Sequence, residues 1–142
     1  MRSHKWSLII GATLLLAVAS ACSFTTANIS SMKLSKDKEG TAETNNFAPT
    51  DTIYAKVNVS NVPSKVTLKL RFFTEDVQGQ EKNAPVPAFD KSFDLPSSGY
   101  VDYYLTPPPQ GWPVGKYRID AAMLIESGEQ KDQESASFTV SQ

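Results

Sequence analysis

The chain has 142 residues, with 14 basic and 15 acidic side chains, one histidine and one cysteine. This length suits a single domain with one hydrophobic core. The formal net charge of −1 argues against a nucleic-acid partner, which would require a surplus of basic residues. A single cysteine leaves no intrachain disulfide, so stability must come from packing.

Residues 1–21 have the pattern of a secretory signal peptide, which we expect to be helical. Arg2 and Lys5 give a basic start, the uncharged apolar run 8–18 follows, and small residues precede the expected cleavage after Ala21. The apolar run is shorter than the roughly 20 residues that a transmembrane helix needs. Removal of this segment leaves 12 basic and 15 acidic residues and no histidine.

Cys22 follows this segment directly, at the position of the acylated residue in bacterial lipoproteins. Ala19-Ser20-Ala21-Cys22 resembles a lipobox, although Ala19 stands where leucine is usual. We therefore expect a lipid on Cys22 that anchors the protein to a membrane. Ser23, rather than an aspartate, favours the outer membrane if the cell has one. The alternative is ordinary cleavage after Ala21, which would give a secreted soluble protein.

The remainder of the chain predicts an all-β domain. Residues 22–28 form a short tether, and residues 29–142 form the domain. Polar, turn-rich residues predict loops over 36–46 and 75–88, the second of them mobile. No helix is expected after the signal peptide. Segments with apolar residues at alternate positions predict seven strands at sandwich-like spacing: 29–34, 52–59, 66–73, 89–95, 100–105, 117–125 and 136–140.

A tight corner is expected between residues 111 and 117, where the sequence is Gly-Trp-Pro-Val-Gly-Lys-Tyr. Pro113 fixes its own φ and favours an extended conformation before it, while Gly115 can adopt a positive φ. Tyr117 follows Pro113 by four residues and starts the longest predicted strand. This spacing lets its phenol reach a backbone group near Pro113.

The Pro113-x-x-x-Tyr117 spacing resembles the tyrosine corner of immunoglobulin-like (Ig-like) and fibronectin-type domains. More narrowly, Gly-Trp-Pro-x-Gly-x-Tyr resembles a signature of small exported bacterial domains of unassigned function. The resemblance implies a seven-stranded, antiparallel Ig-like β-sandwich in which the strand after the corner is the next to last. It implies no catalytic residue.

Trp112 is a large apolar ring held between Gly111 and Pro113. We expect it to fold back as a lid on the core, over the ends of Tyr103, Leu105 and Met123. The alternative is an exposed ring, on a rigid proline-rich loop, that anchors a binding partner.

The residue types left after export argue against catalysis. Without histidine or a free thiol, the domain cannot form a Ser-His or Cys-His catalytic site or a zinc site with histidine ligands. The acidic loop residues Glu75 and Asp76 lack the density of oxygen ligands that calcium needs. We expect no enzyme activity, no cofactor and no metal. The aspartates in or beside strands are interpreted as surface charges: Asp90, Asp94, Asp102 and Asp120.

Binding is the function class that remains, and three surfaces are candidates. The first is a set of outward or terminal aromatic residues: Tyr54, Phe73, Tyr100 and Tyr104. The second is the basic outer face of the third and sixth predicted strands, with Lys69, Arg71, Lys116 and Arg118 near Asp120. The third is the loop end that carries Trp112.

These features favour a cell-envelope lipoprotein whose Ig-like domain contacts a protein partner, as an adaptor or accessory subunit. The first alternative is a carbohydrate- or cell-wall-binding module that uses the exposed tyrosines. The second is a peptidase inhibitor that uses the 75–88 loop. The sequence does not indicate the oligomeric state or the ligand.

The Cys22→Ser variant should leave the membrane and appear in the soluble fraction, because it lacks the thiol that would carry the lipid. Fractionation of cells, followed by mass spectrometry of the N-terminal peptide, measures this. A wild-type protein that is already soluble and carries no lipid on this peptide would contradict the prediction.

Overall fold

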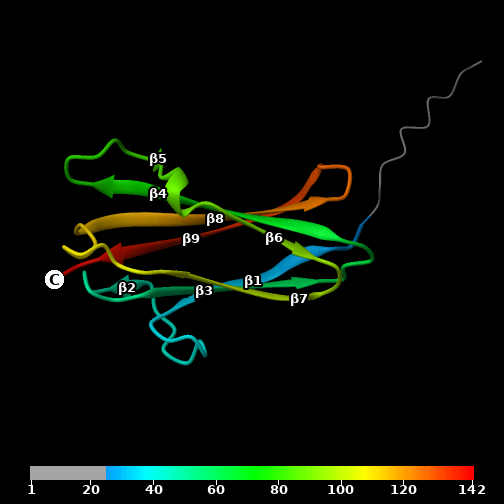
Figure 1. The fold of residues 1–142 in the computed structure, drawn as a ribbon, viewed down its shortest axis with the longest axis horizontal. Helices are drawn as coiled ribbons and strands as arrows, with labels where there is room; N and C mark the ends of the chain where they lie inside the picture. The colour runs from blue at the N-terminus through cyan, green and yellow to red at the C-terminus, as the bar shows by residue number, and fades with distance from the viewer. Residues whose placement is uncertain (1–24) are drawn as a thin grey trace, which may run out of the picture.

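The computed structural model describes residues 25–142, so the expected signal-peptide helix, its cleavage site and Cys22 lie outside the described residues. Within them the chain consists mainly of strands and loops, which confirms the all-β prediction. Two sheets pack face to face as a β-sandwich (Figure 1). The helical part of residues 25–142 is a 3-10 turn, η1 (Pro87–Phe89), and no helix there could cross a membrane.

The smaller sheet has three strands in the order β1-β3-β7, and both pairings are antiparallel. Its strands are β1 (Asn28–Ser35), β3 (Ile53–Ser60) and β7 (Gly99–Leu105).

The larger sheet has six strands. Five follow the order β2-β9-β8-β4-β5, and the sixth, β6, also pairs with β4. These strands are β2 (Asn46–Phe47), β4 (Val66–Val77), β5 (Ala84–Pro85), β6 (Lys91–Leu95), β8 (Gly115–Ile125) and β9 (Gln130–Val140).

The structure has nine strands in the described residues where the sequence predicts seven. The two additional strands have two residues each: β2 begins at the last residue of the expected loop 36–46, and β5 lies within the expected loop 75–88. Such short strands carry no detectable alternation, so their pairing depends on a neighbour: β2 lies parallel to β9, and β5 pairs with β4. The 75–88 segment is therefore partly ordered by β4 and β5.

The boundaries of several elements also differ from the prediction. β4 continues to Val77 past a register shift between Thr74 and Asp76, and β9 begins at Gln130. Phe89 belongs to η1 rather than to β6. Ala27, expected in the tether, is buried against the core, so the sandwich includes the end of that segment.

Alternation places one face of each long strand in the core. In β3 and β8 every second residue is buried, because successive side chains of a strand point to opposite faces. The most deeply buried large side chains come from both sheets: Phe47, Ile53, Val57, Val59, Val66, Leu68, Leu70, Phe72, Ile119, Met123 and Val140.

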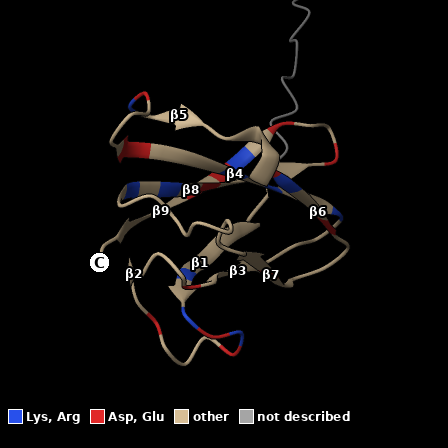
Figure 2. Ribbon diagram, turned by 60° about the vertical axis from the view of Figure 1, so that its left-hand side comes forward, with Lys and Arg blue, Asp and Glu red and all other residues tan. Residues whose placement is uncertain are grey.

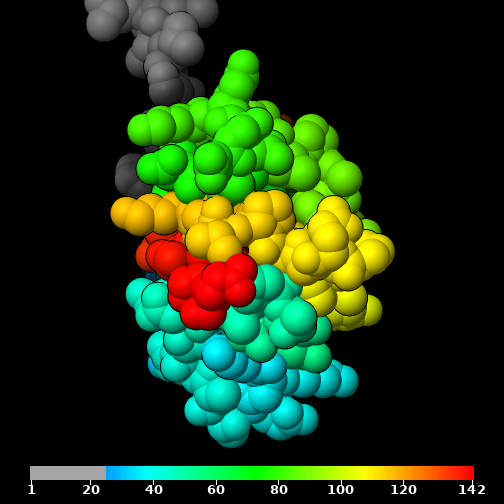
Figure 3. All heavy atoms as spheres, turned by 90° about the vertical axis from the view of Figure 1, so that its left-hand side faces the viewer, coloured from blue at the N-terminus to red at the C-terminus, as the bar shows by residue number. Residues whose placement is uncertain are grey.

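Trp112 closes one end of this core. The side chain is 4% exposed, which settles the choice between a lid and an exposed anchor in favour of the lid. The indole lies 6.1 Å from Phe72, 5.8 Å from Phe89 and 6.4 Å from Tyr117, measured between ring centroids. In Figure 3 the segment around Trp112 (yellow) covers the end of the sandwich beside the 75–90 segment (green).

Two backbone carbonyls of the 48–51 loop hold Trp112 in place. The Trp112 amide donates to the carbonyl of Pro49 at 2.8 Å, and the indole Nε1–H donates to the carbonyl of Asp51 at 2.9 Å. Gly111 makes this approach possible, since a Cβ there would lie 3.0 Å from the carbonyl oxygen of Pro49. The corner is therefore joined to a loop about sixty residues earlier in the chain.

Gly115 has the positive φ that the sequence allows, at 154°. A Cβ at this position would lie 2.6 Å from the carbonyl oxygen of Asp76 and 2.9 Å from Val77 Cγ2. Glycine is thus required for β8 to start against the end of β4.

Tyr117 is 2% exposed, and its hydroxyl donates to the carbonyl of Pro113 at 2.6 Å. This is the hydrogen bond that the spacing of the two residues predicts. Burial raises the pKa of Tyr117 from its ordinary value of 10.0 to about 12, because the interior disfavours the phenolate.

Tyr117→Phe should lower the free energy of unfolding by about 1 kcal/mol, the net value of one hydrogen bond. The folded protein holds the phenol proton more tightly than the unfolded chain does. The advantage over the variant is therefore complete below pH 10 and declines as the pH rises from 10 towards about 12. Urea denaturation of both proteins, at neutral pH and above pH 10, measures this. Tyr104→Phe, on an exposed ring, is the control and should change nothing. Equal midpoints for wild type and Tyr117→Phe at neutral pH would contradict the prediction.

Candidate functional site

The predicted binding residues divide between the two outer faces of the sandwich. Tyr54, Tyr100 and Tyr104 lie on β3 and β7, in the three-stranded sheet. Phe73, Lys69, Arg71 and Arg118 lie on β4 and β8, in the six-stranded sheet. The aromatic set expected as one surface is therefore not brought together, because Phe73 belongs to the other sheet.

Phe73 is only 9% exposed, so the expectation of an available aromatic ring here is wrong. Two guanidinium groups cover it: that of Arg71 lies 5.0 Å from the ring centroid and that of Arg118 lies 4.4 Å from it. Arg118 faces Phe73 directly across the β4–β8 pair. Cation–π attraction and loss of solvent contact hold this stack together.

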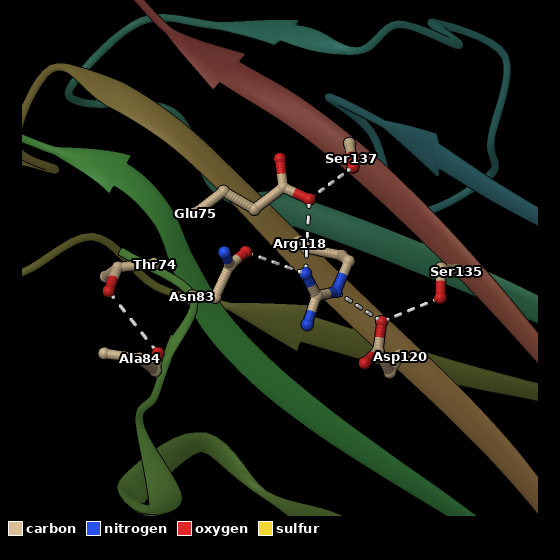
Figure 4. Close-up of polar contacts among 8 residues, drawn as sticks. All are labelled: Thr74, Glu75, Asn83, Ala84, Arg118, Asp120, Ser135 and Ser137. Atoms are coloured by element: carbon tan, nitrogen blue, oxygen red, sulfur yellow. Dashed lines mark hydrogen bonds and ion pairs between the residues drawn. The ribbon is translucent and has the colours of Figure 1, made fainter. Parts of the chain in front are cut away.

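Arg118 is the centre of a polar network on the same face (Figure 4). Its Nε donates to Asp120 at 2.7 Å, and its Nη1 lies 3.4 Å from a carboxylate oxygen of Glu75. Ser135 donates to Asp120 at 2.8 Å and Ser137 donates to Glu75 at 3.0 Å, so both carboxylates have further partners on β9. The hydrogen bond to Asp120 raises the pKa of Arg118 above its ordinary value.

This network neutralises the two arginines of the basic face that the sequence predicts as a candidate binding surface. Arg118 is paired with two carboxylates, and Arg71 lies 3.8 Å from Asp90. Lys69, further along β4, is exposed opposite Ala122 of β8. Figure 2 shows acidic and basic residues side by side along β4 and β8. We conclude that this face mainly stabilises the sheet.

The outer face of the three-stranded sheet has a different character. We call it the tyrosine face and define it by Tyr54, Lys56, Tyr100, Asp102 and Tyr104. Tyr100 is 58% exposed and Tyr104 is 64% exposed, which places both among the most exposed large apolar side chains of residues 25–142. Tyr54 and Tyr104 are directly opposite each other across the β3–β7 pair, with ring centroids 6.2 Å apart.

Lys56 and Asp102 arrange the rings on this face. Lys56 Nζ lies 4.9 Å from the centroid of the Tyr100 ring and 3.7 Å from Asp102 Oδ1. Lys56 is not among the binding residues predicted from the sequence, although alternation places it on the outward face with Tyr54 and Asn58. It is the cross-strand register, Lys56 opposite Asp102, that brings the cation between the tyrosines.

The aspartates do not form a catalytic pair. Asp102 lies on β7 and Asp120 on β8, in different sheets. Among residues 25–142 no three metal-ligating side chains of histidine, cysteine, aspartate or glutamate gather at one point.

The cavity beside Trp112 is small, at about 150 Å³, and Phe72, Phe89 and Tyr117 contribute to its lining. Pockets for small ligands usually measure about 300–1,000 Å³. This end of the sandwich therefore serves the packing of the core.

Arg118→Met should lower the free energy of unfolding by about 1–3 kcal/mol, because it leaves Asp120 and Glu75 without their shared cation. Arg71→Met is the matched control on the same ring. Its side chain is 54% exposed against 22% for Arg118, so its loss should cost at most about 1 kcal/mol. Urea midpoints measure both, and equal losses would contradict the central role of Arg118.

No family model matches the chain, and no curated protein matches it. Among solved structures, the chain is similar to the soluble domain of PmoD from Methylocystis sp. ATCC 49242 (Rockwell), with a TM-score of 0.45 and 15% sequence identity. The alignment covers 78% of this chain and 89% of that chain. This similarity is too weak to assign a family or a function.

Proposed function

We propose that the protein is a non-enzymatic lipoprotein of the bacterial cell envelope whose β-sandwich binds a partner protein through the tyrosine face. The observation that carries this proposal is the exposure of Tyr100 and Tyr104, two residues of one strand on one face. Tyrosine is enriched in protein interfaces because it contributes a large contact area and a polar hydroxyl with few rotatable bonds.

The fold proposed for this role is Ig-like, of the fibronectin type. Its support is the order of the seven long strands: the first, second and fifth form one sheet, and the other four form the second sheet. The hydrogen bond from Tyr117 to Pro113 lies at the start of the sixth long strand, where Ig-like sandwiches have their tyrosine corner. Lipid attachment at Cys22 is proposed from the sequence alone.

The surrounding charges favour a protein partner over a sugar. Lys56 and Asp102 give the tyrosine face both signs of charge within its area, as at the polar rims of protein interfaces. The inhibitor alternative receives no support from the 75–88 segment, since β5 pairs with β4 and the Val86 amide donates to the carbonyl of Phe72 at 2.8 Å.

A photo-crosslinking amino acid in place of Tyr104 should crosslink to a protein in intact cells. The same amino acid in place of Val114 is the control, because Val114 is also exposed but lies at the corner, away from the tyrosine face. Adding Tyr100→Ser to the crosslinking chain should reduce the yield about tenfold or more, as loss of an interface aromatic does. Equal crosslinking from both positions would contradict the proposal. Glycan binding that Tyr100→Ser and Tyr104→Ser abolish would favour the carbohydrate alternative.

A further inference from the structure

The four longer strands at the sheet edges differ in how their backbones are protected. An unpaired edge is a template for another strand, and proteins block it with proline, inward charges, bulges or covering segments. Each edge can therefore be examined for such protection.

Three of these four edge strands have a feature that protects the edge. β1 has a register shift between Ile29 and Ser31, and a bridge from Ser35 to Glu43 covers its end. β9 has β2 along its C-terminal end, and its N-terminal half carries Lys131, Asp132 and Glu134. β6 has five residues, and Lys91 lies on its inward-facing side, opposite Leu70.

β7 has none of these features. It has seven residues without proline or lysine, and it pairs with β3 without a register shift. Its other edge makes no backbone hydrogen bond within the described part of the chain. β6 and β7 share a turn but belong to different layers (Figure 1), so β6 does not cover this edge.

A groove of about 460 Å³ runs beside the free edge, lined by Lys91, Phe93, Asp102, Tyr103 and Tyr104. Phe93 lies opposite Leu68 and packs only partly against the core, so its ring provides an apolar floor. Lys91 is exposed and has no ion-pair partner among residues 25–142. Asp102, by contrast, is paired with Lys56. The uncompensated charge of the groove is therefore positive.

We propose that β7 binds an extended segment of the partner protein by strand addition, and that this segment carries an apolar residue over Phe93 and an acidic residue near Lys91. Strand addition draws affinity from backbone hydrogen bonds and specificity from alternate side chains. Side chains on one face of the added strand point towards Lys91 and Phe93, and those on the other face lie beside Tyr100 and Tyr104. This mode rests on the proposed function and specifies how the tyrosine face would engage its partner.

The probe is a phage-displayed library of random linear peptides, selected on the purified protein with its native N-terminus. Enriched peptides should alternate, with acidic and apolar residues two positions apart. On binding, hydrogen exchange should slow at alternate amides of β7, because the other half already face β3. Peptides without this pattern, or protection outside β7, would overturn the proposal.

A charge reversal provides the specific test. Lys91→Glu should weaken binding of the acidic peptides at least about tenfold and select basic peptides instead, since like charges in an interface are strongly unfavourable. Lys65→Glu makes the same charge change in the exposed turn before β4 and should leave selection unchanged. Equal effects of the two variants would overturn the role of Lys91 and the groove.

The two proposals fail in different ways. If Tyr104 crosslinks to a partner but no peptide protects β7, the tyrosine face remains and strand addition is wrong. If the tyrosine variants retain all crosslinking while peptides protect β7, strand addition remains and the tyrosine face is not the contact.

Discussion

Six aromatic rings pack together at one end of the sandwich and connect four strands of the larger sheet with the corner and η1. Phe72 is the centre, because its ring lies within 6.2 Å of the rings of Phe89, Trp112, Tyr117 and Phe138. Tyr117 is stacked on Phe138 at 5.4 Å, with 11° between the ring planes. The rings come from β2, β9, β8, β4, the corner and η1: Phe47, Phe138, Tyr117, Phe72, Trp112 and Phe89. They join segments that no disulfide could link, because the chain has one cysteine.

The size of this contribution follows from ordinary magnitudes. Removal of a buried aromatic side chain typically costs about 3–5 kcal/mol, and a small domain has a total stability of about 5–15 kcal/mol. Trp112 is buried, and its indole N–H donates a hydrogen bond to the carbonyl of Asp51. The side chain therefore stabilises both the core and the loop at 48–51. A side chain buried to this extent is poorly placed to serve as a binding anchor.

The two outer faces illustrate how similar residues acquire different roles. On the six-stranded sheet, Phe73 is closed off by two arginines, and Arg118 is neutralised by Asp120 and Glu75. On the three-stranded sheet, Lys56 contacts Tyr100 from one side and leaves the ring exposed. The narrower sheet also ends at β7, whose outer edge pairs with no strand in the described residues. Exposed aromatic rings and a free backbone edge thus occur on the same strand.

The all-β class, most long strands and the corner can be predicted from the sequence, because alternation in β3 and β8 and the spacing of Pro113 and Tyr117 are local properties. The short strands β2 and β5, the burial of Phe73 and the free edge of β7 depend instead on contacts between distant segments. Phe73 and Tyr100 both occupy outward positions in their strands. What separates them is Arg118, which is 45 residues from Phe73 in sequence and adjacent to it across β4 and β8. Exposure depends on such neighbours from other strands, and a local pattern does not contain them.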